Sequence, residues 1–105
     1  MSRMKIVLTY VDSEKNAENI AESLLKERLA ACVGFWSGRS RYWWKGKIEK
    51  NNNEIHMIVK TKESLVKECV KRIKELHNYE LPVIDVLDIE KLNPEAEKWI
   101  NEVTK

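Results

Sequence analysis

The sequence has little glycine, little cysteine and no long apolar run, and each shortage excludes a class of function. Three glycines among 105 residues leave no glycine-rich loop that could cradle a phosphate group. The two cysteines, Cys32 and Cys69, are too far apart for the usual metal-ligand spacing. Apolar runs such as residues 6–8 are far shorter than the ~20 residues of a membrane-spanning helix. We therefore expect no membrane anchor and no cysteine metal centre.

The N-terminal residues favour a cytoplasmic location, and the charge balance limits the expected binding partners. Residues 1–5 lead directly into a strand-like run and show no export signal. We therefore expect the two cysteines to be reduced thiols in the cytoplasm. The net charge is +2, with acidic and basic residues interspersed along the chain. This balance argues against a dominant surface for polyanions, although it allows a local basic patch.

The most informative segment is residues 40–48, which read Ser-Arg-Tyr-Trp-Trp-Lys-Gly-Lys-Ile. The segment holds three aromatic and three cationic side chains. An aromatic side chain removes about 150–250 Å² of surface from water when it is buried. The segment must therefore be covered by the core of its own chain, by another subunit or by a ligand.

Apolar periodicity predicts the secondary structure. Strands are expected at residues 5–11, ~31–48, 54–60 and 83–89, and helices at ~14–28, 65–76 and from Pro94. A turn is expected at residues 51–53, which are three asparagines. A bend is expected near Gly34 or Gly38, and helix caps are expected at Ser13, Thr61 and Asn93. The order predicts an α+β, ferredoxin-like β-α-β-β-α-β sandwich with an antiparallel sheet and a short C-terminal helix, as a single domain over residues 1–105.

Both faces of the expected sheet are apolar, which favours self-association. The first strand carries Ile6, Leu8 and Tyr10 on one side and Val7 and Val11 on the other. In this architecture the helices cover only one face of the sheet. A short terminal helix is too small to hide the whole second face. The pattern therefore predicts that another copy of the chain covers it.

Four motifs in order resemble the CutA family of divalent-cation tolerance proteins. They are Arg28-Leu-Ala-Ala-Cys-Val33, Ser40-x-Tyr42-x-Trp44-x-Gly46-Lys-Ile48, Glu54 with Lys60-Thr61, and His77-x-Tyr79-Glu80-x-Pro82. The resemblance runs from the first strand to Trp99. It implies a ferredoxin-like subunit in a compact homotrimer, in which the long second and third strands reach over neighbouring subunits. It also implies a link to tolerance of copper and other divalent ions and a structural similarity to the trimeric PII signalling proteins. No firmly assigned chemical reaction comes with it.

The resemblance also gives candidate site residues. We expect a cleft between subunits at Trp44, Glu54, Lys60, Tyr79 and Glu80. The charged members could pair across the interface and set its register, or the cleft could hold a small polar ligand. We expect the trimer interface to include Tyr42, Trp43 and Trp44, because adjacent tryptophans suit a strand between subunits.

His77 is the candidate metal ligand, because imidazole suits copper or zinc. No cysteine or second histidine lies near it in the sequence to complete the coordination shell. Cys69 lies on the apolar stripe of a helix and is expected to be a buried thiol. His56 alternates with apolar neighbours and is expected on the surface of the sheet. We therefore expect no required cofactor, and Cu(II) or another divalent cation as a weakly held partner.

The basic and aromatic residues around positions 39–50 also resemble a surface for single-stranded nucleic acid. RNA-recognition domains of the same strand order carry their aromatic residues on the third strand, where this chain reads Glu-Ile-His-Met-Ile-Val-Lys. Nucleic-acid binding is therefore the remote alternative. No serine lies beside a histidine that could act as its base. The expected function is a non-enzymatic homotrimer in divalent metal tolerance, and the alternative is a PII-like small-ligand signalling or scaffold module.

Overall fold

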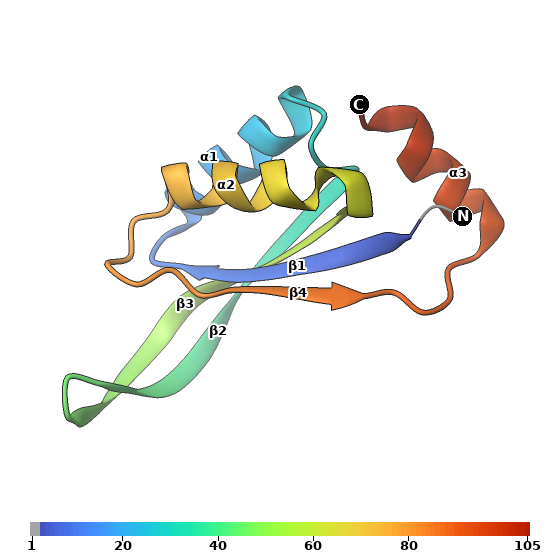
Figure 1. Ribbon diagram of the computed structural model, residues 1–105. Coiled ribbons are helices and arrows are strands. Elements are labelled where there is room, and N and C mark those ends of the chain that lie inside the picture. The colour runs from blue at the N-terminus through green and yellow to red at the C-terminus, as the bar shows by residue number, and fades with distance from the viewer. Residues whose placement is uncertain (1–2) are drawn as a thin grey trace.

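The computed structural model describes residues 3–105. The described chain forms four strands and three α-helices, which Figure 1 shows in order. They are β1 (Met4–Val11), α1 (Glu14–Lys26), β2 (Cys32–Trp44), β3 (Lys47–Lys62), α2 (Val66–Leu76), β4 (Ile84–Asp88) and α3 (Pro94–Val103), with a 3₁₀ turn at Glu63–Leu65.

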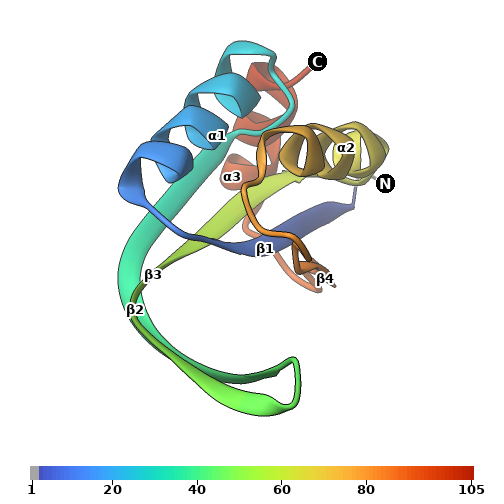
Figure 2. The same ribbon diagram turned by 90° about the vertical axis from the view of Figure 1, so that its left-hand side faces the viewer.

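The strands form one antiparallel sheet in the order β2-β3-β1-β4. Helices α1 and α2 lie on one face of this sheet, and α3 lies at one end of the molecule (Figures 1 and 2). The order and the layers confirm the predicted ferredoxin-like α+β fold. Ser13 caps α1 as predicted, because its hydroxyl accepts a hydrogen bond from the amide of Asn16.

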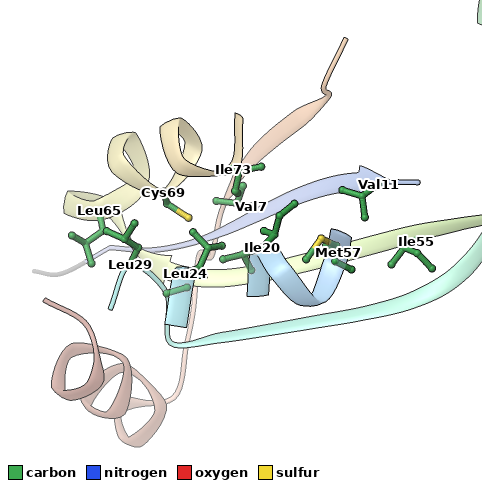
Figure 3. Packing of buried hydrophobic residues seen from close by; sticks show 13 residues of the cluster. Val7, Val11, Ile20, Leu24, Leu29, Ile55, Met57, Leu65, Cys69 and Ile73 are labelled. Atoms are coloured by element: carbon green, nitrogen blue, oxygen red, sulfur yellow. The ribbon is translucent and has the colours of Figure 1, made fainter. Parts of the chain in front are cut away.

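The core lies between the sheet and the two helices (Figure 3). Val7 and Met57 from the sheet meet Ile20 from α1 and Ile73 from α2, and each of these side chains is at most 1 % exposed. Cys69 is fully buried in the same cluster, as its place on the apolar stripe predicts. The alternate residues of each strand point to the other side of the sheet.

Within residues 3–105 no helix covers the second face of the sheet, which we call the open face. Residues that pair directly across strands share a face, so the register places Leu8 beside Ile58 and Tyr10 beside His56. The open face comprises Ile6, Leu8, Tyr10, Trp36, His56, Ile58 and Leu87, with Lys60 and Asp85 among them. Leu87 is 45 % exposed and Trp36 is 52 % exposed.

The β2–β3 hairpin projects from the body of the molecule, and its outer part, residues 40–51, is the arm (Figure 2). The arm curves below the open face. It makes the molecule 45 × 26 × 21 Å in extent with a radius of gyration of 14.4 Å, whereas a compact chain of this length has about 13 Å.

The tip of the arm corrects one prediction. The turn lies at Lys45-Gly46, both with positive φ (50° and 83°), which is the requirement of a tight two-residue hairpin turn. The prediction of a turn at residues 51–53 is therefore wrong, and these asparagines lie inside β3. The predicted bend is confirmed at Gly38, because the β2–β3 register shifts between Gly38 and Ser40.

Two helix ends also differ from the predictions. Thr61 is not a helix cap. It lies in β3, is fully buried, and donates its hydroxyl hydrogen to the carbonyl of Leu29 at 2.7 Å. Asn93 precedes α3 and Pro94 is its first residue, but the Asn93 side chain makes no capping hydrogen bond and instead donates to Glu95.

Candidate functional site

A cavity of about 540 Å³ lies between the arm and the loop that precedes β4. Its walls combine aromatic side chains with two carboxylates. The lining residues are Tyr10, Ser40, Arg41, Tyr42, Trp43, Trp44, Glu54, Tyr79, Glu80, Leu81 and Val83. The volume is that of an ordinary small-molecule site.

Glu54 is the polar centre of this cavity. Its side chain comes from β3 and is only 5 % exposed. One carboxylate oxygen accepts a hydrogen bond from the Ser40 hydroxyl at 2.5 Å, and the other accepts one from the Tyr79 hydroxyl at 2.6 Å. Distances this short are typical of charge-assisted hydrogen bonds to an ionised carboxylate. Two strands and a loop are therefore tied together through one buried carboxylate.

Tyr79 is held as a hydrogen-bond donor. Burial, followed by the hydrogen bond to Glu54, raises the pKa of Tyr79 well above its ordinary value. The phenol therefore keeps its proton at any physiological pH. It acts as a fixed donor to Glu54 and not as a proton carrier.

His77 anchors the loop that carries Tyr79. Its Nδ1 accepts a hydrogen bond from the Tyr79 amide at 3.1 Å, so Nε2 carries the ring proton and donates to the Thr9 hydroxyl at 3.2 Å. Thr9 in turn donates to the carbonyl of Val83 at 2.9 Å. Burial lowers the pKa of His77 below its ordinary value of 6.5, and the neutral ring is the form that these bonds require.

A row of aromatic rings on the open face continues from the cavity. The ring of His56 stacks on Trp36 and meets the edge of Tyr10. Gly38 makes room for this histidine, because a Cβ there would lie 2.5 Å from His56 Nε2. The placement of the half-buried His56 on the sheet surface agrees with its alternation in the sequence. Burial raises the pKa of Tyr10, and Asp85 and Glu54 raise it further.

The structure brings most of the predicted cleft residues together. Trp44, Glu54, Tyr79 and Glu80 all line the cavity. Lys60 does not. It lies six residues from Glu54 along β3, a separation of about 20 Å at 3.3 Å per residue, and pairs with Ile6 and Cys32 instead.

The predicted interface residues lie on the arm. Trp43 is 72 % exposed, Tyr42 is 41 % exposed and Trp44 is half-buried. The register places Trp43 directly opposite Ile48, which is 56 % exposed. An apolar pair is therefore left open on one side of the arm.

Sequence reasoning missed two polar members of the site, Ser40 and Tyr10. The sequence placed Ser40 in a motif and Tyr10 on one side of the first strand, but it predicted no role in the site for either residue. Both come to Glu54 or its cavity because the arm curves. The glycines predict a bend in this strand, but no local pattern predicts its direction. The tip residue Lys45 was also missed. Its ammonium lies 5.5 Å from the ring centre of Trp44 and 3.6 Å from the Glu80 carboxylate.

A single chain offers little to a metal ion. Within residues 3–105, no three His, Cys, Asp or Glu side chains are grouped so that they could hold one. Burial raises the pKa of Cys69 to about 12, so its thiolate is not available as a ligand at neutral pH. Among the same residues, every helix is too short or too polar to cross a membrane.

Comparison with known proteins agrees with the fold and with the motifs. The family described as CutA1 divalent ion tolerance protein matches residues 5–103. The divalent-cation tolerance protein CutA of Pyrococcus horikoshii is 44 % identical over 97 % of this chain and 99 % of its own length.

Solved structures extend the agreement to three dimensions. The structure named as the periplasmic divalent cation tolerance protein CutA from Archaeoglobus fulgidus is 36 % identical, covers 97 % of this chain and 99 % of its own, and has a TM-score of 0.93. CutA1 from Ehrlichia chaffeensis is 29 % identical, covers 100 % of this chain and 98 % of its own, and also has a TM-score of 0.93. The chain therefore belongs to the CutA1 family of divalent ion tolerance proteins.

Proposed function

We propose that this protein is a non-enzymatic, cytoplasmic homotrimer that acts in divalent-cation tolerance and binds Cu(II) or another divalent ion weakly. The observation that carries the proposal is the open apolar face of the sheet together with the exposed apolar pair, Trp43 and Ile48, on the arm. Contiguous apolar surface of this kind marks an interface between proteins.

The shape of the arm favours a closed ring of subunits rather than a two-fold symmetric dimer. It projects from one side of the subunit and presents a surface different from the sheet that it would cover. Contact between two different surfaces is heterologous, and such contacts form a ring when the rotation closes. Three subunits are what the resemblance to the CutA family implies.

The hydroxyl groups of the site support a non-enzymatic role. Ser40 is bonded to Glu54 and not to a histidine. Thr9 lies beside His77, but that ring nitrogen donates to it and therefore cannot act as its base. Free thiols at Cys32 and Cys69 support the cytoplasmic location.

Weak copper binding follows from the state of His77. Its one lone pair, on Nδ1, is occupied by the amide of Tyr79. A metal at this nitrogen would displace that hydrogen bond, which contributes about 0.5–1.5 kcal/mol. Further ligands would have to come from another subunit, because the described part of the chain groups no three of them.

Calorimetric titration of the metal-free protein with Cu(II) tests this proposal. We expect weak, saturable binding that His77→Gln strongly reduces, since glutamine can replace both hydrogen bonds of the ring but is a poor metal ligand. Binding requires the neutral imidazole. Because burial lowers the pKa of His77, the neutral ring persists below pH 6.5, and copper affinity should fall only at a lower pH than for an ordinary histidine.

The matched control is His56→Gln, which removes the other histidine of the chain. It should leave the copper titration unchanged. An unchanged titration in His77→Gln would exclude His77 as the ligand without affecting the trimer. A PII-like role in binding a small ligand is the second candidate function, and the cavity around Glu54 favours it.

A further inference from the structure

The buried charge of Glu54 has no counter-ion in the described chain. Glu54 is the only charged residue among those that are buried within residues 3–105. Its two hydrogen bonds come from neutral hydroxyls, and no Lys, Arg or His nitrogen within the same residues forms an ion pair with it. A buried carboxylate without a cation is costly. Such a group inside a cavity indicates a cationic ligand.

Two basic residues lie near Glu54, Arg41 in the wall of the cavity and Lys45 at the tip of the arm, and neither forms an ion pair with it. The guanidinium of Arg41 donates to the carbonyl of Ser40 at 2.9 Å. The ammonium of Lys45 pairs with Glu80. The charges of Lys45 and Glu80 balance each other at the rim, and the carboxylate of Glu54 remains the unmatched ionised group of the interior.

The walls of the cavity are suited to an organic cation. They include the rings of Tyr10, Tyr42, Trp43, Trp44 and Tyr79. The face of an aromatic ring attracts a cation within about 6 Å, and aromatic cages of this kind bind quaternary ammonium groups. Lys45 demonstrates the effect within the chain, because its ammonium lies 5.5 Å from the centre of the Trp44 ring.

We propose that this cavity binds a small organic ammonium cation, with Glu54 as its counter-ion and the arm tryptophans as its aromatic wall. A bare metal ion fits the site less well. Of the two carboxylates in its walls, Glu80 is paired with Lys45, and Glu54 with several phenol and indole rings does not make a coordination shell. The volume of about 540 Å³ also exceeds what a metal ion would fill and lies in the range of small-molecule sites.

The proposal goes beyond metal tolerance and names a ligand class for the second candidate function. It rests on the cavity and not on the number of subunits, so it can be wrong while the trimer proposal is right. The mass of the particle in solution tests the trimer, whereas ligand titration tests the cavity.

The test uses two probes of nearly the same shape and different charge. Choline carries a quaternary ammonium, and 3,3-dimethylbutan-1-ol is its neutral counterpart. Each is titrated into the intact wild-type protein, with tryptophan fluorescence and calorimetry as readouts. We expect saturable choline binding and an affinity for the neutral alcohol that is at least about tenfold lower, because only the cation gains from the rings and the carboxylate.

Two variants locate the binding. Glu54→Gln keeps an acceptor oxygen for the hydroxyl donors but removes the charge, and it should weaken choline at least about tenfold. Glu68→Gln removes a carboxylate that pairs with Lys105 on the far side of the molecule, and it should bind choline as the wild type does. The comparison of the two probes needs only the wild type, so it holds even if Glu54→Gln fails to fold.

Three results would overturn the proposal. Equal affinity for choline and the alcohol would show an apolar pocket without preference for charge. Choline binding that survives in folded Glu54→Gln would place the cation elsewhere. Absence of choline binding to a trimeric wild type would assign the counter-ion of Glu54 to a lysine or arginine of a partner subunit.

Discussion

Trp43→Ala should dissociate the proposed trimer and leave the subunit folded. Trp43 is 72 % exposed in the single chain, and a surface substitution of this kind changes subunit stability by only about 0.5 kcal/mol. At the centre of an interface, loss of a tryptophan costs more than about 2 kcal/mol. In a closed ring of three subunits, the Trp43 contact would be lost at each of the three interfaces. Light scattering after gel filtration at micromolar concentration reports the mass, and far-ultraviolet circular dichroism reports the fold.

Leu25→Ala is the matched control. Leu25 is 43 % exposed but lies on α1, away from the arm and the open face. Its removal should leave the mass unchanged. If Trp43→Ala also stays trimeric with an unchanged melting temperature and loses affinity for oligonucleotides, the arm is a nucleic-acid surface instead of a subunit interface.

Glu54→Ala should destabilise the protein by about 2–3 kcal/mol. The change leaves the hydroxyls of Ser40 and Tyr79 without their acceptor, and each hydrogen bond to a charged group contributes about 1.5–3 kcal/mol. The net loss of stability is smaller than the sum of the two hydrogen bonds, because removal of the carboxylate also removes the cost of burying its charge. Thermal unfolding at one fixed protein concentration measures the loss, since assembly makes the melting temperature depend on concentration.

Glu54→Gln separates the hydrogen bonds from the charge. The amide keeps one acceptor oxygen, so its loss of stability should be smaller than that of Glu54→Ala. A Glu54→Ala variant as stable as the wild type would mean that the buried charge costs as much as its two hydrogen bonds contribute.

The order of elements could be predicted because it depends on local patterns. Alternation in residues 5–11 and helical spacing in residues 65–76 report burial directly. The hairpin turn was misplaced because three asparagines are a strong turn signal. The correct signal was Gly46, which permits the positive φ of a two-residue turn between Trp44 and Lys47.

The candidate site could be predicted only in part. The motif resemblance grouped Trp44, Glu54, Tyr79 and Glu80, and the structure places all four around one cavity. Lys60 belongs to the same motif as Glu54 but lies six residues further along β3. Ser40 reaches Glu54 because the arm is bent beyond the bulge at Gly38. The glycine predicts a bend near this position, but the direction that brings Ser40 to Glu54 depends on how the two strands pair and cannot be read from either strand alone.

We propose that this chain assembles as a trimer through its open face and its arm. The most direct test is the mass of the wild-type protein by light scattering after gel filtration at micromolar concentration. We expect three times the subunit mass of 12.4 kDa. A particle of 12.4 kDa under the same conditions would contradict it, because the apolar face and the arm would then be stable in water without a partner.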